Sequence, residues 1–136
     1  IRETMNKLGK TMLLFEGGKS LELNQSVIHS GVEGALNVMK FLKMQPGEIM
    51  IERDPVFVHK SKWLRAPFSG IFQSLAKNGS YVKRRAIIGT ISDPFGEFEK
   101  NVFAPFDCYI FGLNTAPIVY KGDAIFHIST EATQKI

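Results

Sequence analysis

The second half of the chain contains an internal repeat. "APF" at residues 66–68 recurs at residues 104–106, and "VKRRAIIGTI" at residues 82–91 matches "VYKGDAIFHI" at residues 119–128. Valine, isoleucine, phenylalanine and tyrosine fill the short runs between these segments, and turn signals separate the runs. Unrelated short strands would not keep a near-constant offset of 38 and 37 residues. The repeat therefore predicts an all-β unit of two half-units, related by a pseudo-two-fold axis and packed into one small barrel or sandwich.

This pattern resembles the barrel-sandwich hybrid of biotinyl and lipoyl carrier domains, in which a Pro-x-x-Gly segment and a Val-x-x-Gly-Asp segment each occur twice. The second copy here fits that pattern, whereas Arg84 and Arg85 replace the usual turn residues in the first copy. The turn between the two copies reads "SDPFGEFEKN", and Lys100 lies there between Glu99 and Asn101 without flanking methionines. Because the overall pattern resembles such domains, a carrier or scaffold domain with the prosthetic group on Lys100 is an alternative to the function considered below.

The first part of the chain has an α/β pattern, and it meets the β part near Pro46 and Gly47. We predict an incomplete α/β domain over residues 1–46 and the β domain over residues 47–136. "TMLLF" at residues 11–15 is a continuous apolar run, as expected for a strand buried on both faces of a parallel sheet. A helix over about residues 26–42 carries one apolar stripe. Met5 and Leu8 lie one helical turn apart before Gly9, which predicts a first, shorter helix that ends there. One strand and two helices cannot close a core, so we expect the end of a larger domain whose upstream part lies outside this chain.

Glu16 follows the predicted strand directly, and Gly17 and Gly18 follow Glu16. In open α/β sheets, ligands and catalytic groups collect beyond the carboxyl ends of the strands. A carboxylate held there suits a general base that takes a proton from an attacking water, and the two glycines would let a substrate approach the backbone. The alternative is a structural glutamate that pairs with a lysine or caps the following helix.

The order of these segments is similar to that of the succinylglutamate desuccinylase/aspartoacylase family. "GKTMLLFEGG" at residues 9–18 resembles the family's strand that ends in Glu-x-Gly, and "GVEGALNVMKFLKM" at residues 31–44 resembles the helix that closes its carboxypeptidase-like domain. "WLRAPFSGIF", "ISDPFGEF" and "NVFAPFDCYIF" resemble its C-terminal barrel. The resemblance implies a zinc-dependent hydrolase of an N-acyl amide bond with a small N-acyl amino acid-like substrate. It implies that Glu16 is the general base, with Gly17 and Gly18 beside the substrate.

The same resemblance implies where the zinc would be bound. The family holds zinc through a His-x-x-Glu pair and a distant histidine, all upstream of this glutamate, and none of these is in the chain. We therefore expect zinc in the full-length parent but none on this chain, which alone should be inactive. The missing upstream half of the catalytic domain is the expected partner, and a homo-oligomer is a further option.

Composition limits the compartment of the protein and the kinds of partner that it could bind. A single cysteine, Cys108, excludes an internal disulfide and fits a reducing compartment, and no apolar run approaches the ~20 residues of a membrane helix. We therefore expect a cytoplasmic protein without a membrane anchor. The net charge of +4 is a mild excess, which favours a solvated basic surface over a partner nucleic acid. A basic face could still make the β unit a nucleic-acid-binding barrel; its residues would be Lys60, Lys62, Arg65, Lys83, Arg84 and Arg85.

The remaining metal-ligating and reactive residues are interpreted as structural. His29 and Glu33 lie one helical turn apart, but two ligands do not make a metal site. His59 and His127 lie in strand-like runs without partners at ligand spacing, and Cys108 is expected in the core. Trp63 is the candidate for packing between the two parts of the chain.

Overall fold

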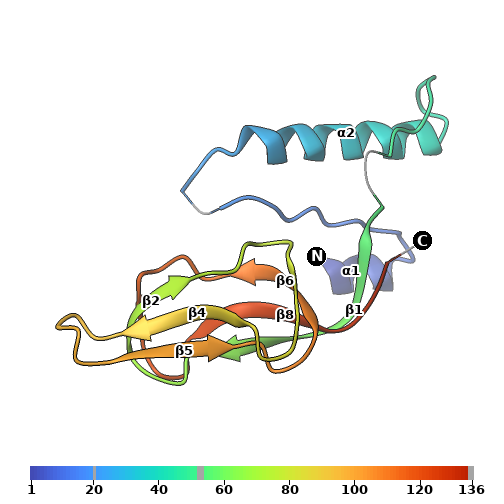
Figure 1. The fold of residues 1–136 in the computed structure, drawn as a ribbon. Coiled ribbons are helices and arrows are strands. Elements are labelled where there is room, and N and C mark those ends of the chain that lie inside the picture. The colour runs from blue at the N-terminus through green and yellow to red at the C-terminus, as the bar shows by residue number, and fades with distance from the viewer. Residues whose placement is uncertain (20, 52–53, 135–136) are drawn as a thin grey trace. The chain divides into compact units, whose positions relative to one another are not determined.

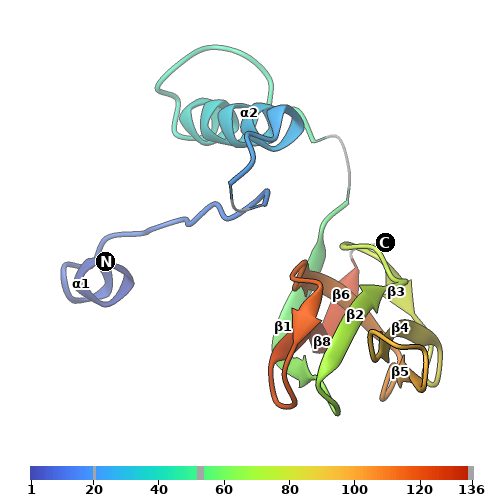
Figure 2. The same ribbon diagram turned by 90° about the vertical axis from the view of Figure 1, so that its left-hand side faces the viewer.

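The computed structural model describes residues 1–19, 21–51 and 54–134. The chain divides into two compact units, residues 1–52 and 53–136. Figures 1 and 2 show that the first unit holds the helices and the second holds the strands. The elements are α1 (Arg2–Lys7), α2 (Gln25–Phe41), β1 (Val56–Arg65), β2 (Gly70–Ser74), β3 (Tyr81–Val82), β4 (Ile87–Ser92), β5 (Glu99–Phe103), β6 (Cys108–Leu113), β7 (Ile118–Val119) and β8 (Ala124–Gln134). No helix of the described residues is long and apolar enough to span a membrane.

Helix α2 confirms the helix predicted over residues 26–42. Its N-cap residue is Asn24, whose side-chain Oδ1 accepts a hydrogen bond from the Val27 N–H at 3.2 Å and so caps the first turn. It ends where Lys43 adopts a left-handed conformation with φ of 57°. There the N–H groups of Lys43 and Met44 donate to the carbonyl oxygens of Lys40 and Met39, which satisfies the last turn.

The strand predicted at residues 11–15 is not formed. The segment has no regular secondary structure, and the side chains of Leu13 and Phe15 are 76% and 60% exposed. A strand requires a neighbour to complete its hydrogen bonds, and the described residues of this unit supply none. No described residue of this unit is buried.

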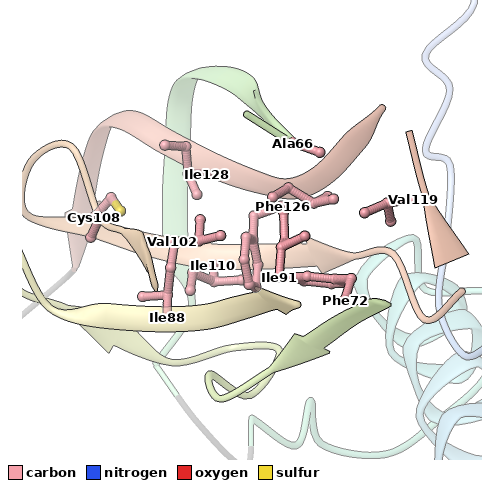
Figure 3. Close-up of a cluster of buried hydrophobic side chains, with 12 residues drawn as sticks. Ala66, Phe72, Ile88, Ile91, Val102, Cys108, Ile110, Val119, Phe126 and Ile128 are labelled. Carbon is pink, nitrogen blue, oxygen red and sulfur yellow. The ribbon is translucent and has the colours of Figure 1, made fainter. Parts of the chain in front are cut away.

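The second unit contains two four-stranded antiparallel sheets, β1-β8-β6-β3 and β5-β4-β2-β7. Each sheet contributes buried side chains to one hydrophobic core (Figure 3), with Ile88 and Ile91 from β4 and Phe126 and Ile128 from β8. The rings of Phe72 and Phe126 meet edge to face, with centroids 5.5 Å apart. This unit is the sheet-rich domain predicted from the sequence.

The two sheets correspond strand for strand. If four is added to the number of each strand, and the count continues from β1 after β8, the order β1-β8-β6-β3 becomes β5-β4-β2-β7. The pairing of residues between neighbouring strands agrees with this shift. Arg65 of β1 pairs with Ala124 of β8, and the residues at the corresponding positions, Phe103 of β5 and Ile87 of β4, also pair. The offsets between these residues are 38 and 37, as in the sequence repeat.

Side-chain contacts between the halves follow the same correspondence. The Lys62 ammonium lies 4.7 Å from the centroid of the Phe106 ring, and the Lys100 ammonium lies 4.3 Å from that of Phe68. Lys100 and Phe106 each follow their counterparts, Lys62 and Phe68, by 38 residues. In both contacts the lysine lies over the aromatic ring, an arrangement stabilised by the ring quadrupole.

Candidate functional site

The candidate site is the segment around Glu16, which packs against α2. A Cβ atom built on Gly31 of α2 would lie 3.0 Å from Cε1 of Phe15, and one built on Gly17 would lie 2.6 Å from Cγ1 of Val27. Both glycines therefore allow a close approach between segment and helix that a side chain would prevent. Glu16 lies between Phe15 and Gly17, and these two anchored neighbours hold it beside α2.

The backbone turns directly after this anchor. Gly18 has φ of +86°, a conformation that favours glycine. Gly17 packs against α2, and contact of either glycine with a substrate stays a prediction. Both glycines were identified from the sequence, whereas the anchoring contacts join residues that no local pattern connects.

Glu16 is exposed, and its carboxylate forms no hydrogen bond or ion pair with another described residue. The cap of α2 is Asn24, and Lys19 instead lies 3.5 Å from Glu22. The two structural roles considered for Glu16 are therefore filled by other residues within the described part of the chain. Its role as a general base is compatible with this environment and stays a prediction.

An apolar groove of about 720 Å³ lies in the same unit. Helix α2 forms one wall, and the segments on either side of the helix in sequence contribute Leu13 and Ile49. Asn37 holds residue 50 beside the helix, because its amide donates to the Met50 carbonyl at 2.7 Å and accepts from the Met50 N–H at 3.1 Å. The remaining lining residues are Thr11, Ala35, Val38, Phe41 and Leu42. The apolar stripe of α2 was visible in the sequence, but the groove was not.

The described residues do not fit a zinc ion on their own. They contain no group of three or more histidine, cysteine, aspartate or glutamate side chains that could hold a metal. His29 and Glu33 lie on α2 as predicted, and neither contacts another titratable side chain of the described residues. A catalytic zinc takes three protein ligands, so Glu16 and its surroundings cannot supply the site alone.

The other two histidines have hydrogen-bond partners in the β unit. His59 Nε2 lies 2.9 Å from Thr133 Oγ1, and His127 Nε2 lies 3.0 Å from Ser61 Oγ. The His127 ring also stacks on Trp63, with centroids 4.4 Å apart. Both histidines thus have a hydrogen-bond partner within the β unit, and their structural role stays a prediction. Packing of Trp63 between the two parts of the chain stays a prediction.

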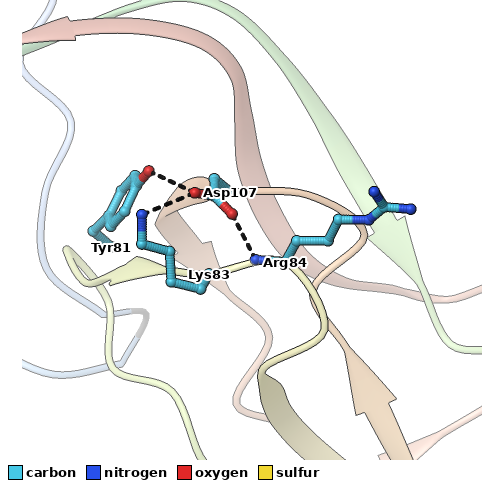
Figure 4. A network of polar contacts seen from close by, with 4 residues as sticks. All are labelled: Tyr81, Lys83, Arg84 and Asp107. Atoms are coloured by element: carbon cyan, nitrogen blue, oxygen red, sulfur yellow. Dashed lines mark hydrogen bonds and ion pairs between the residues drawn. The ribbon is translucent and has the colours of Figure 1, made fainter.

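A polar network connects the turn after β3 to Asp107 (Figure 4). The Lys83 ammonium donates to Asp107 Oδ2 at 3.0 Å, the Arg84 N–H donates to Oδ1 at 2.8 Å, and the Tyr81 hydroxyl donates to Oδ2 at 3.3 Å. The Arg84 N–H, followed by Lys83, lowers the pKa of the Asp107 carboxyl below its ordinary value. The hydrogen bond and the charge of Asp107 raise the pKa of Lys83. The sequence analysis missed Asp107, because nothing in its local sequence indicates a partner 23 residues upstream.

Most basic side chains of the predicted basic face contact other residues of the same chain. Lys60 pairs with Glu131 at 2.7 Å, and the Arg65 guanidinium donates to the Gly122 carbonyl at 2.7 Å. Together with Lys62 over Phe106 and Lys83 on Asp107, these contacts occupy four of the six basic side chains named for that face. The arrangement gives little support to a nucleic-acid interface, because such an interface needs cations free to meet phosphates.

Lys100 does not lie in the turn between the two halves, where the carrier alternative requires it. It belongs to β5, and the exposed tip of the preceding turn is Phe95, which is 84% exposed. The hairpin pairs Ser92 with Glu99, so the strand begins before Lys100 and removes it from the turn. Cys108 is 2% exposed within the core as predicted, and burial raises the pKa of its thiol.

Comparison with known proteins identifies the fold. No protein-family model matches the chain, and no curated protein matches it. Among solved structures, a succinylglutamate desuccinylase from Silicibacter sp. TM1040 matches with a TM-score of 0.80 and 16% identity, over 98% of this chain and 41% of its own. A succinylglutamate desuccinylase/aspartoacylase family protein from Shewanella amazonensis SB2B matches with a TM-score of 0.78 and 15% identity, over 98% and 40%. An ectoine utilization protein from Ruegeria pomeroyi, solved with product bound, matches with a TM-score of 0.72 and 15% identity, over 91% and 39%.

The chain thus spans about 40% of the length of these structures. At these identities the likeness concerns the fold, and it extends over both units of the chain. It is consistent with a C-terminal portion of such proteins, as the order of the sequence segments predicted. The chain therefore has the fold of the C-terminal part of succinylglutamate desuccinylase/aspartoacylase family proteins.

Proposed function

We propose that the chain is the C-terminal part of a hydrolase of the succinylglutamate desuccinylase/aspartoacylase type, which cleaves the N-acyl amide bond of a small N-acyl amino acid. The observation that carries this proposal is the fold likeness over 98% of the chain to a succinylglutamate desuccinylase. Glu16 adds chemical support, because it is an exposed carboxylate without a partner among the described residues.

In this proposal Glu16 is the general base. A water oxygen attacks the amide carbonyl carbon while the Glu16 carboxylate accepts a proton from that water. The carbon–nitrogen bond then breaks, and Glu16 passes the proton to the leaving nitrogen, so that a carboxylic acid and an amine are released. Such a positioned base contributes roughly 100-fold to 10,000-fold to the rate. Phe15 and Gly17, anchored on α2, would hold the carboxylate in place, and Gly18 would turn the backbone away from the substrate.

Zinc enters this proposal only through residues outside the chain. The described residues hold no three-ligand group, so the metal ligands of such a hydrolase would have to come from the part of the protein that this chain does not contain. The isolated chain is accordingly proposed to be inactive. We place the protein in the cytoplasm, in keeping with the single, buried cysteine of this chain.

We further propose that residues 1–46 end the catalytic domain and that residues 47–136 form a barrel-sandwich hybrid with an internal pseudo-two-fold. The equal strand orders of the two sheets support the repeat. The two reciprocal lysine–phenylalanine contacts also support it. This domain would help to select the substrate or the oligomeric state.

The test is Glu16→Gln in the complete protein, with Glu22→Gln as the matched control. Glu22 is an exposed glutamate of the same loop that pairs with Lys19. We expect Glu16→Gln to lower turnover of an N-acyl amino acid by at least ~100-fold, with zinc content close to wild type. Glu22→Gln should retain turnover. Turnover near wild type in Glu16→Gln would exclude Glu16 as the general base.

A further inference from the structure

We propose that two copies of this chain pair along β5, in antiparallel orientation about a two-fold axis at Asn101. The acidic hairpin (residues 93–99) of each copy would then lie beside the basic turn (residues 83–86) of the other copy. The inference concerns the surface of the β unit and does not depend on the role of Glu16.

The two ends of β4 carry opposite charges that have no partner. Arg84 and Arg85 in the basic turn are exposed, and their side chains form no ion pair with another described residue. Glu97 and Glu99 in the acidic hairpin are also exposed, and neither forms an ion pair within the described part of the chain. Figure 1 shows the hairpin projecting from one end of β4, and the six residues of this strand span roughly 20 Å. The two ends of one copy are therefore too far apart to neutralise each other.

Strand β5 connects the two ends and has an open edge. It begins at Glu99, which pairs with Ser92 next to the acidic hairpin. It ends at Phe103, and there the Ala104 N–H donates to the carbonyl of Ala86 in the basic turn at 2.9 Å. β5 is the last strand of its sheet, so its second edge has no neighbouring strand among the described residues. The backbone groups of such an edge are a template for a strand from another chain.

Antiparallel self-pairing of β5 brings the opposite charges together. The strand runs from the acidic hairpin to the basic turn, and a two-fold axis reverses this direction in the second copy. An axis at Asn101, the middle residue of β5, pairs all five residues and places Glu99 opposite the partner's Phe103. A different partner with one sign of charge would match one end of β4 and be repelled by the other. We therefore commit to a second copy as the occupant.

The same arrangement adds an apolar contact at each end. The tip of the acidic hairpin is the strongly exposed Phe95. Next to the basic turn, Ile87 and Phe103 pair across β4 and β5, and their side chains are 47% and 50% exposed. Pairing about Asn101 brings the hairpin that carries Phe95 beside this pair in the second copy, so that apolar surface is covered at both ends of the interface.

The other long edge strand, β1, is unsuited to self-pairing. Lys60 and Lys62 lie on either side of Ser61, and antiparallel pairing about Ser61 would place Lys60 opposite the partner's Lys62. Like charges directly opposite each other destabilise a strand pair. In β5 the corresponding arrangement places Lys100 opposite the partner's Val102. The edge strands β3 and β7 have two residues each, which leaves β5 as the strand that fits a second copy.

The first experiment measures dimerisation of the chain by sedimentation velocity. Arg84→Glu combined with Arg85→Glu should weaken the dimer at least ~10-fold, because it places acidic side chains beside the acidic hairpin of the second copy. Glu97→Lys combined with Glu99→Lys should weaken it by a similar factor. The chain that carries all four substitutions should dimerise like wild type, since its charges are again complementary with the signs reversed.

A matched control and the salt dependence separate this interface from other associations. Lys10→Glu combined with Lys121→Glu changes the net charge as much as the arginine variant does, at exposed positions outside the proposed interface, and should leave the dimer unchanged. Far-UV circular dichroism checks that each variant folds. The net charge of +4 repels a second copy, so salt would strengthen an association through the apolar groove of the first unit. We expect salt to weaken the pairing proposed here.

The second experiment keeps all wild-type charges and tests the axis directly. Residues opposite each other in an antiparallel pair have Cβ atoms about 4.5–5.5 Å apart, so two Asn101→Cys copies should be joined by a short thiol–thiol cross-linker. Thr90→Cys is the matched control, because Thr90 is the neighbour of Asn101 on β4 and lies three strand spacings, roughly 14 Å, from its equivalent in the second copy. It should not be joined. The native Cys108 is buried and does not compete for the reagent.

Three results would overturn the inference. The first is a chain that stays monomeric at ~100 μM, since a weaker association would not be a specific dimer under ordinary conditions. The second is a dimer that persists in both charge-reversed variants, or that is weakened in one and unchanged in the other. The third is equal cross-linking of Asn101→Cys and Thr90→Cys. Turnover near wild type after Glu16→Gln would reject the proposed function and leave this inference in place.

Discussion

Arg85 has a backbone conformation that normally favours glycine. Its φ is 66°, and Gly122, its counterpart 37 residues later, has φ of +98°. Both residues occupy the same turn position, since the Arg85 N–H donates to the Ala104 carbonyl at 2.8 Å and the Gly122 N–H donates to the Ala66 carbonyl at 2.9 Å. We therefore expect substitutions at the two positions to have opposite effects on stability.

The magnitudes follow from the backbone alone. A left-handed conformation costs a non-glycine residue about 1–2 kcal/mol, and a glycine adds about 0.4–1 kcal/mol of chain entropy to the unfolded state. Arg85→Gly should therefore stabilise the β unit by about 0.5–1 kcal/mol. Gly122→Ala should destabilise it by a similar amount. A Cβ atom at Gly122 would meet no atom within 4 Å, so no clash contributes to that cost.

The assay is urea unfolding of each variant, followed by the fluorescence of Trp63. This is the only tryptophan of the chain, and it lies in β1 of the β unit. In a domain of this size, 1 kcal/mol corresponds to about 4–8 °C in the midpoint of thermal unfolding, which gives an independent measure. Arg84→Gly is the matched control, because Arg84 is the neighbouring exposed arginine and its φ is not positive. It should be neutral or destabilising.

Two outcomes would refute the reasoning. A loss of stability in Arg85→Gly would mean that the arginine side chain contributes more than its backbone costs. An unchanged midpoint in Gly122→Ala would mean that the two turns do not share one conformational requirement. The second result would also weaken the proposed pseudo-two-fold, because it would mean that the two matching turns differ.

Two further predictions concern the β unit. Asp107→Asn should lower the midpoint of thermal unfolding at pH 7, with Asp54→Asn as an exposed control. The folded-state pKa of Asp107 is depressed, so the stabilisation by its carboxylate is fully present above the unfolded-state pKa and is lost as the pH falls through the folded-state pKa. The unfolding midpoints of wild type and Asp107→Asn should therefore converge as the pH falls through that folded-state pKa. A difference between the two midpoints that stays constant with pH would contradict the network. The buried thiol of Cys108, whose pKa is raised by desolvation, should react with iodoacetamide only in denaturant, and rapid labelling of the native chain would contradict its place in the core.

The β unit could be predicted from the sequence because its signals are local. Turn residues separate each pair of strands, and the repeated "APF" segments at residues 66–68 and 104–106 have the same spacing as the strands that follow them. The helix over residues 26–42 was predictable for the same reason, since its apolar stripe and its cap lie within one segment. Only Lys100 was assigned to a turn although it lies in β5.

The candidate site was predictable only in part. Glu16, Gly17 and Gly18 were named because they follow an apolar run directly and because the order of the segments resembles that of the family, and their roles stay predictions. The strand at residues 11–15 was wrong for this chain, because a strand exists only with neighbours and the described residues supply none. The packing of Phe15 on Gly31 and the network on Asp107 join residues far apart in sequence, which spacing rules do not connect.

The correspondence between the two sheets accounts for the backbone of the β unit but not for its surface chemistry. Trp63, His127 and Phe111 form a row of ring contacts across β1, β8 and β6. Trp63 stacks on His127 with centroids 4.4 Å apart, and Phe111 meets His127 at a tilt with centroids 4.3 Å apart. The positions that match them on β5, β4 and β2 are the polar residues Asn101, Thr90 and Gln73. The strand orders of the two sheets agree, but the registers differ at one point of this comparison, because Phe111 lies at a register shift between Ile110 and Gly112, whereas Gln73 pairs with Thr90 without one. The aromatic row therefore lies where the two sheets differ, and the sequence repeat could not have predicted it.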